Sequence, residues 1–166
     1  MAATYEPIAT TTLSSATASY TFSSIPSSYT DLVLIFNGSN ALGNDAYLVQ
    51  INGAAGTNYC ATYLESDGST VYSSRWADRA DIPVARGAST TAGADMVTMN
   101  FFNYTNTNMY KSFIARYSLA STTGNRASLT VGTYKATTAI TSILFKSSGS
   151  TMSTGSTLTL YGIKAA

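Results

Sequence analysis

Short runs in which apolar and polar residues alternate follow one another along nearly the whole chain. A period of two is the pattern of a β-strand with one buried face. In the last run, Leu158 and Leu160 fall on one face, and Thr157, Thr159 and Tyr161 fall on the other. Clusters of Gly, Asn, Ser, Thr and Pro separate the runs, and no segment shows the 3.6-residue period of a helix. The pattern predicts an all-β protein.

The alternation predicts about nine or ten strands. They are 18–22, 30–37, 47–52, 59–64, 71–74, 96–103, 110–119, 127–134, 139–146 and 157–164. Short strands at this spacing are typical of a sandwich or barrel, and an eight-stranded jelly roll lies within the range. We therefore predict an antiparallel, jelly-roll-like β-sandwich of about 8–10 strands. The run from Leu32 to Phe36 is apolar on both faces, which places its strand centrally.

The length of the chain, 166 residues, fits a single domain. Because the strand pattern begins at Ala18, we expect residues 1–17 to be an N-terminal leader or arm and residues 18–166 to be one β-sandwich domain. A chain of this length buries roughly 70% of its unfolded surface, so it needs no disulfide or metal to be stable. The single cysteine, Cys60, excludes an intrachain disulfide.

The residues offer little catalytic or metal chemistry. The chain has no histidine, which removes the commonest general base and the commonest zinc ligand. Glu65 with Asp67, or Asp78 with Asp81, resembles the carboxylate pair of a glycosidase, although solvated loop positions are the simpler interpretation. The spacings of a calcium loop or a phosphate-binding loop are missing. We expect no enzyme activity, no cofactor and no metal.

Neither a nucleic acid nor a membrane is expected as a partner. The net charge is only +1 and the basic residues are dispersed, so the electrostatic footprint of a nucleic-acid-binding protein is missing. No apolar run approaches the ~20 residues that cross a bilayer, and the first residues lack the features of a secretory signal.

Charge is distributed unevenly along the chain. Residues 1–95 contain all eight acidic residues and three of the nine basic ones, whereas residues 96–166 contain six basic residues and no acidic one. An asymmetry that survives folding would give complementary patches for neighbouring copies. The alternative is chance drift in a sequence with few charges.

The stretch 77–94 fits the strand pattern least, because its charges, Pro83 and two glycines predict a long irregular excursion. Such excursions often form interfaces. The candidate interface residues are Arg75, Trp76, Asp78, Arg79, Asp81 and Arg86. Trp76 has two interpretations: a stacking platform for a sugar ring, or an anchor for a loop or an interface.

Three stretches together resemble a known family. They are 11–16 leading into 20–34, then 138–143, and finally 155–164. They are similar to small virion structural proteins of tailed phages, frequent in aquatic and cyanobacterial phages, which are usually labelled decoration or tail-fibre proteins. The resemblance implies a virion location, a jelly-roll fold and a homotrimer, and it implies no catalytic residues. Residues 68–95 depart from it, so the partner of that region is not implied.

Three functions follow as hypotheses. The first is a capsid decoration, or cement, protein that binds the major capsid protein lattice and stabilises the head, with residues 1–17 as a strand or arm onto the capsid. The alternative is a tail-fibre or spike receptor-binding knob that contacts host glycans through Trp76, Tyr72, Arg75 and Asp78. A polysaccharide depolymerase is least favoured. In the first two cases the protein is made in the host cytoplasm and ends on the virion surface.

Overall fold

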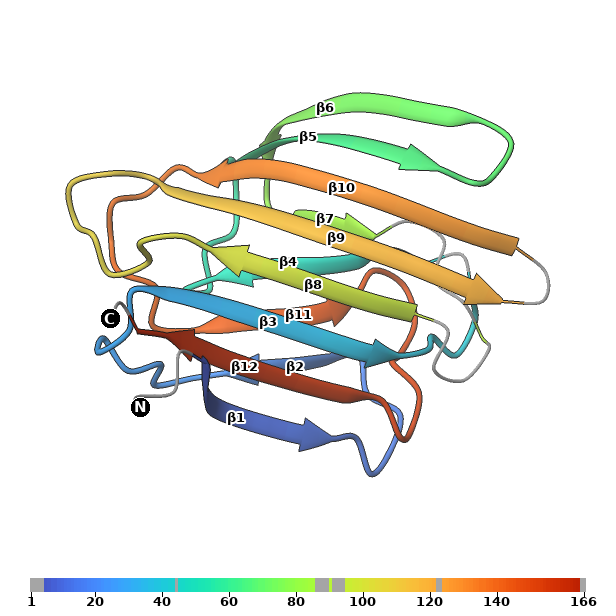
Figure 1. Cartoon of the computed structure of the whole chain (residues 1–166), viewed down its shortest axis with the longest axis horizontal. Helices are drawn as coiled ribbons and strands as arrows, with labels where there is room; N and C mark the ends of the chain where they lie inside the picture. Colours follow the sequence, from blue (N-terminus) through green and yellow to red (C-terminus); the bar gives the residue numbers. More distant parts are fainter. Residues whose placement is uncertain (1–4, 44, 86–89, 91–94, 122–123, 165–166) are drawn as a thin grey trace.

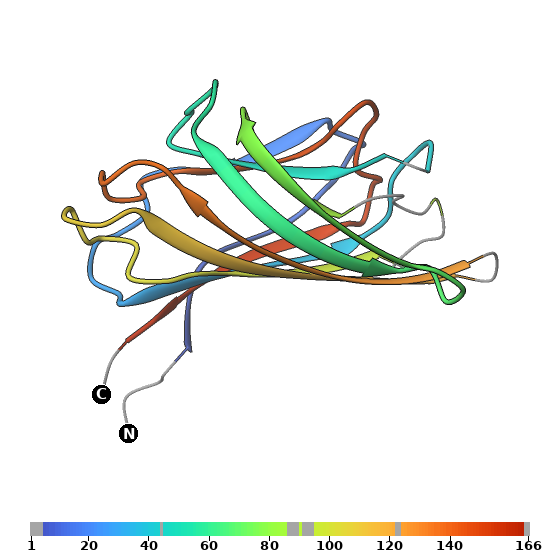
Figure 2. The ribbon, with the colours of Figure 1, turned by 90° about the horizontal axis from the view of Figure 1, so that it is seen from above.

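The computed structural model describes residues 5–43, 45–85, 90, 95–121 and 124–164. Within these ranges, twelve strands form two antiparallel sheets, which lie one behind the other in Figure 1 and are seen from above in Figure 2. The prediction of an all-β sandwich is confirmed. The strands outnumber the expected 8–10 because two of them lie in segments that were not expected to be strands.

Eight of the strands divide equally between the two sheets. They are β1 (Tyr5–Thr12), β2 (Ser19–Phe22), β3 (Asp31–Gly38), β4 (Tyr47–Ile51), β7 (Ile82–Ala85), β8 (Asp95–Phe101), β11 (Ile143–Ser147) and β12 (Thr157–Ile163). One sheet has the order β1-β12-β3-β8, and the other has β2-β11-β4-β7. The chain changes sheet at every step among these eight strands except from β4 to β7. Eight strands in these two four-stranded orders form a double-sheet jelly roll.

Two hairpins are inserted into this jelly roll. The first is β5 (Tyr59–Ser66) with β6 (Val71–Arg79), and the second is β9 (Lys111–Ser121) with β10 (Gly124–Tyr134). The hairpins pair with each other through β10 and β5, and β9 pairs with β8. They therefore continue the first sheet as β8-β9-β10-β5-β6, in the upper part of Figure 1. We call the four strands β9, β10, β5 and β6 the hairpin extension.

Aromatic rings join the two sheets at the centre of the core. Phe36 on β3 stacks on Phe145 of β11, with ring centroids 4.9 Å apart, and lies 4.7 Å from the ring of Tyr47 on β4. All three side chains are fully buried. The central position expected for β3 is confirmed, since β12 and β8 pair with its two sides.

The segment expected to be a leader or arm, residues 1–17, contains β1. This strand pairs with β12 from Tyr5 opposite Ile163 to Thr12 opposite Thr157, so residues 5–12 are an edge of the large sheet. The alternation is weak here because threonines replace the apolar residues of an ordinary strand.

The irregular excursion expected at 77–94 is wrong for residues 77–85. Strand β6 continues to Arg79, and the four residues of β7 are all buried. A strand buried on both faces shows no alternation, which is why the pattern missed it. Pro83 is tolerated because β7 is an edge strand of its sheet. Residues 86–89 and 91–94 lie outside the described residues.

A close approach of strands at Gly132 controls the packing of the hairpin extension. A Cβ atom at this position would lie 2.3 Å from the backbone oxygen of Cys60 and 2.5 Å from the ring of Phe113. Only glycine fits here without a shift of the backbone of β5.

We therefore expect Gly132→Ala to lower the free energy of unfolding by about 1–3 kcal/mol, the usual cost of overpacking. Gly124→Ala is the matched control on the same strand, because a Cβ atom there meets nothing within 4 Å. The control should change the free energy of unfolding by no more than about 0.5 kcal/mol. Urea denaturation followed by circular dichroism measures both, and equal effects would contradict the packing argument.

Candidate functional site

All eight carboxylates of the sequence are among the described residues, and each has a partner within the chain. The partners are Lys164 for Glu6, the Asn103 amide for Asp31, Ser147 and Ser148 for Asp45, Arg126 for Glu65, Ser69 and Thr70 for Asp67, Lys135 for Asp78, Arg79 and Lys146 for Asp81, and Tyr47 and Tyr117 for Asp95. The acidic side chains are thus engaged in holding strands and turns together.

A buried polar cluster lies between the two sheets. Asp95 is fully buried and accepts hydrogen bonds from the hydroxyls of Tyr47, at 2.7 Å, and Tyr117, at 2.9 Å. Burial, and then the nearby charge of Asp95, raises the pKa of both tyrosines, so they remain protonated donors. Glu65 is also buried, and Arg126 donates to it at 3.0 Å. These interactions compensate the cost of burying two carboxylates.

The carboxylate pairs that resembled a glycosidase serve separate purposes. Glu65 is held by Arg126, whereas Asp67 accepts hydrogen bonds from the backbone amides of the turn between β5 and β6. Asp78 forms an ion pair with Lys135 at 2.5 Å, and Asp81 forms others with Arg79 and Lys146.

Folding neutralises much of the charge asymmetry. Five ion pairs occur among the residues that the structure describes, and four of them join an acid from residues 1–95 to a base from residues 96–166. The two stretches interleave in the sheets, so their opposite charges meet inside one molecule. These acids are therefore already paired within their own chain.

The candidate interface residues do not form one surface. Strand alternation turns Arg75 to the outer face of the large sheet and Trp76 to the inner face. Trp76 is partly buried and stacks on Tyr63, with ring centroids 4.2 Å apart and planes at 21°. One face of its ring is therefore covered and unable to stack on a sugar.

The other candidates divide in the same way. Asp78, Arg79 and Asp81 are taken up by the ion pairs given above. Arg86 lies outside the described residues. Among the described candidates, only Arg75 keeps an exposed position on a sheet face without being held in an ion pair.

The outer face of the hairpin extension has an unexpected composition. On β10, Leu129 and Val131 point outward and are 40% and 44% exposed, while Thr130 and Gly132 point toward the interior. This is the reverse of the usual arrangement, in which the larger apolar residues of a strand are buried.

Exposed aliphatic side chains from three further strands lie on the same face of the sheet. Leu64 on β5 lies directly opposite Leu129, Val71 is at the start of β6, and Met96 is on β8. We call Leu64, Val71, Met96, Leu129 and Val131 the outer patch. Exposed apolar groups gathered on one face mark interaction surfaces on soluble proteins.

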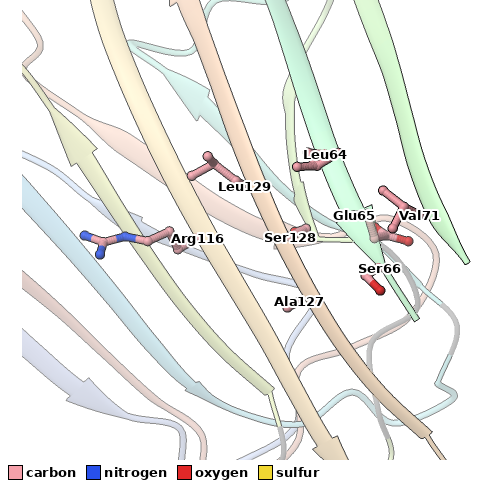
Figure 3. Close-up of a pocket in the computed structure, with 8 residues that line it drawn as sticks. All are labelled: Leu64, Glu65, Ser66, Val71, Arg116, Ala127, Ser128 and Leu129. Atoms are coloured by element: carbon pink, nitrogen blue, oxygen red, sulfur yellow. The ribbon is translucent and has the colours of Figure 1, made fainter. Parts of the chain in front are cut away.

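The outer patch contains two hollows, separated by Arg116 on β9. A groove of about 380 Å³ lies on one side, lined mainly by Leu64, Val71 and Leu129 (Figure 3). A second hollow of about 200 Å³ lies on the other side, beside Met96. In Figure 3 the guanidinium of Arg116 extends away from Leu129. Within the described part of the chain, Arg116 forms no hydrogen bond or ion pair.

The comparisons with known proteins do not assign a family. No known family matches the sequence, and no curated protein matches it. Among solved structures, the chain is similar to a scytalido-glutamic peptidase solved with a peptide-based transition-state analogue, at 12% identity and a TM-score of 0.25. The similarity covers 91% of this chain and 66% of the peptidase, just under two thirds of its length. A likeness this weak carries no argument about function.

Two further properties concern only the described residues. They include no group of three or more His, Cys, Asp or Glu side chains placed to hold a metal ion. They also contain no helix with the length and hydropathy needed to cross a membrane.

The contribution of the turn carboxylate Asp67 to stability can be tested by changing the pH. Hydrogen bonds from the amides of Thr70 and Ser69 hold the pKa of Asp67 below its ordinary value. A lowered folded pKa stabilises the protein above the unfolded value of about 3.9 and loses that effect as the pH falls through the folded value.

We therefore expect Asp67→Ala to melt at a lower temperature than the wild type at pH 7, with the gap closing as the pH is lowered below about 4. Thermal melts monitored by circular dichroism from pH 7 downward measure the gap. A gap that stays constant over this range would show that the charge of Asp67 plays no part.

Proposed function

We propose that this chain is a structural protein of a tailed-phage particle, and specifically a decoration protein that binds the major capsid protein lattice and stabilises the head. The observation that carries this proposal is the outer patch, a broad, weakly charged and apolar face on a jelly-roll sandwich. The resemblance of residues 11–16, 20–34, 138–143 and 155–164 to virion proteins supports the location. The engagement of all eight carboxylates within the fold favours binding over hydrolysis.

A decoration protein works by bridging neighbouring subunits of a shell. An apolar face suits that role, because burial of apolar surface is little affected by salt, whereas contacts between exposed charges are screened. Three copies arranged around a lattice axis would repeat the same contact, so a homotrimer is part of the proposal.

The number of copies per particle tests this function. A decoration protein should be present at on the order of hundreds of copies, because a capsid lattice repeats its binding site many times. Quantitative mass spectrometry of purified particles measures the number relative to the major capsid protein, and immunogold labelling shows its position.

Absence from purified particles would overturn the proposal. Label confined to tails, with few copies, would instead support the receptor-binding knob, and a host-glycan array with wild type and Trp76→Ala would then decide whether Trp76 takes part. Release of reducing sugar from a host polysaccharide, lost in Glu65→Gln, would identify an enzyme instead.

A further inference from the structure

The edges of both sheets are poorly suited to pairing with another strand. In the large sheet, β1 carries Pro7 and a register shift beside it, and β6 contains Asp78 at φ 55° with a register shift against β5. In the small sheet, β2 has four residues and β7 carries Pro83 with a further shift against β4. Proline, irregular register and short length are the features that prevent association through sheet edges. A partner is therefore expected on a face.

Charge on the outer face of the hairpin extension has one sign. Strand alternation and pairing place Arg116 and Arg75 on this face of β9 and β6. The other outward residues on strands β8, β9, β10 and β5 are uncharged. Glu65 also lines the groove, but it is buried and paired with Arg126. Asp78, at the irregular end of β6, is paired with Lys135. The face is apolar with a positive centre, and it complements an apolar surface that carries negative charge.

Arg116 indicates what such a partner presents. Of the basic residues in 96–166, Lys111 is surrounded by backbone carbonyls and four others form ion pairs with carboxylates. Arg116 alone among them lacks a partner in the described structure. An arginine fork is well matched to a carboxylate, which it binds with two parallel hydrogen bonds.

A second copy of this chain fits the face poorly. All eight of its carboxylates already have partners within their own fold, so each would bind Arg116 in competition with a partner of its own chain. Two copies packed outer face to outer face about a two-fold axis would also bring arginines of the same sign together. The complementary surface therefore belongs to a different protein.

We propose that the outer patch is the docking surface for an apolar, acidic segment of a partner protein, with aliphatic side chains in the two hollows and a carboxylate on Arg116 between them. This inference rests on the proposed function, because it makes the partner a neighbouring protein of the particle. It adds the face that binds, the residue that selects the partner and the chemistry that the partner must show.

The hollows suit side chains of a protein surface better than a free small molecule. The larger groove, about 380 Å³, is near the lower end of the size of small-molecule pockets and lies open on a sheet face. Open apolar hollows beside a central charge resemble the anchoring pockets of protein interfaces, where a few side chains provide most of the binding energy.

A capped octapeptide of alternating leucine and glutamate is the probe for this surface. Titration into the isotope-labelled wild-type protein should shift backbone amide resonances around Arg116, Leu129 and Leu64. The matching leucine–lysine and serine–glutamate peptides should bind at least about tenfold more weakly, because each lacks one half of the complementary chemistry.

Two single variants separate the role of Arg116 from that of net charge. Arg116→Gln should weaken binding of the leucine–glutamate peptide about tenfold, by loss of a charge-assisted hydrogen bond. Lys164→Gln removes one positive charge near the opposite edge of the large sheet, beside β1 and β12, where Lys164 pairs with Glu6. This variant should leave the affinity unchanged.

A third variant tests the apolar contribution. The double substitution Leu64→Thr and Leu129→Thr keeps residues that suit strands while removing the aliphatic groups, and it should also reduce binding at least about tenfold. Melting temperatures close to that of the wild type would show that the fold is retained.

Several results would overturn the docking surface. They are no shifts on the outer patch at millimolar peptide, shifts centred on another face, or equal affinities for Arg116→Gln and Lys164→Gln. This outcome is separable from failure of the proposed function. If the protein is abundant on particles but its outer patch does not bind the peptide, only the docking surface is contradicted. If the outer patch binds the peptide but the protein is absent from particles, only the virion role is contradicted.

Discussion

The close contact of β10 with β5 at Gly132 is the constraint on which the hairpin extension depends. The Gly132 backbone lies against the Cys60 carbonyl and the ring of Phe113, so no side chain fits there. The contact fixes the register of β10 between its two neighbours. Because side chains alternate along a strand, a slip by one residue would exchange its faces. The slipped strand would direct Leu129 and Val131 inward and expose Thr130.

Large residues on the neighbouring strands explain why small ones face inward in the middle of β10. Phe113 and Tyr117 on β9, with Tyr63 on β5, occupy the space beneath the hairpin extension. Interiors are close-packed, so in the middle of β10 these side chains leave room only for Thr130 and Gly132. At the end of the strand, Tyr134 turns inward and stacks on Tyr59. The aliphatic residues of β10 lie outside because the interior is already full. The aromatic residues that fill the interior thus account for the aliphatic residues of β10 in the outer patch.

The fold was largely predictable from sequence, because a period of two survives wherever a strand has one buried face. It was not predictable for β1, where threonines hide the period, or for β7, whose four residues are all buried. The site was not predictable for a different reason. Alternation on β10 separates Leu129 and Val131 from Thr130, but it does not say which set faces inward. The volumes of side chains on β9 and β5 decide that, and only the pairing of strands brings them together.

Strand alternation also explains why Arg75 and Trp76, which were expected to share one interface, lie on opposite faces of the sheet. Neighbours in sequence on a strand point to opposite faces, so residues 75–81 could share a surface only if they formed a loop. They are instead mostly strand, and Trp76 contributes its ring to the interior beside Tyr63. The residues that do share a face, Leu64, Arg116 and Leu129, are separated by long stretches of sequence and are brought together by cross-strand pairing.

Stability alone gives a weak reason for aliphatic side chains at these outward positions. A cross-strand pair such as Leu64 and Leu129 contributes roughly 0.2–1 kcal/mol, and threonines in the same places would also suit a strand. Most of the chain's solubility depends on Ser, Thr and Asn, because few residues are charged. Exposed leucine, valine and methionine around one unpaired arginine work against that solubility. Their presence is better explained by a surface that is covered when the protein is in place than by the needs of the isolated fold.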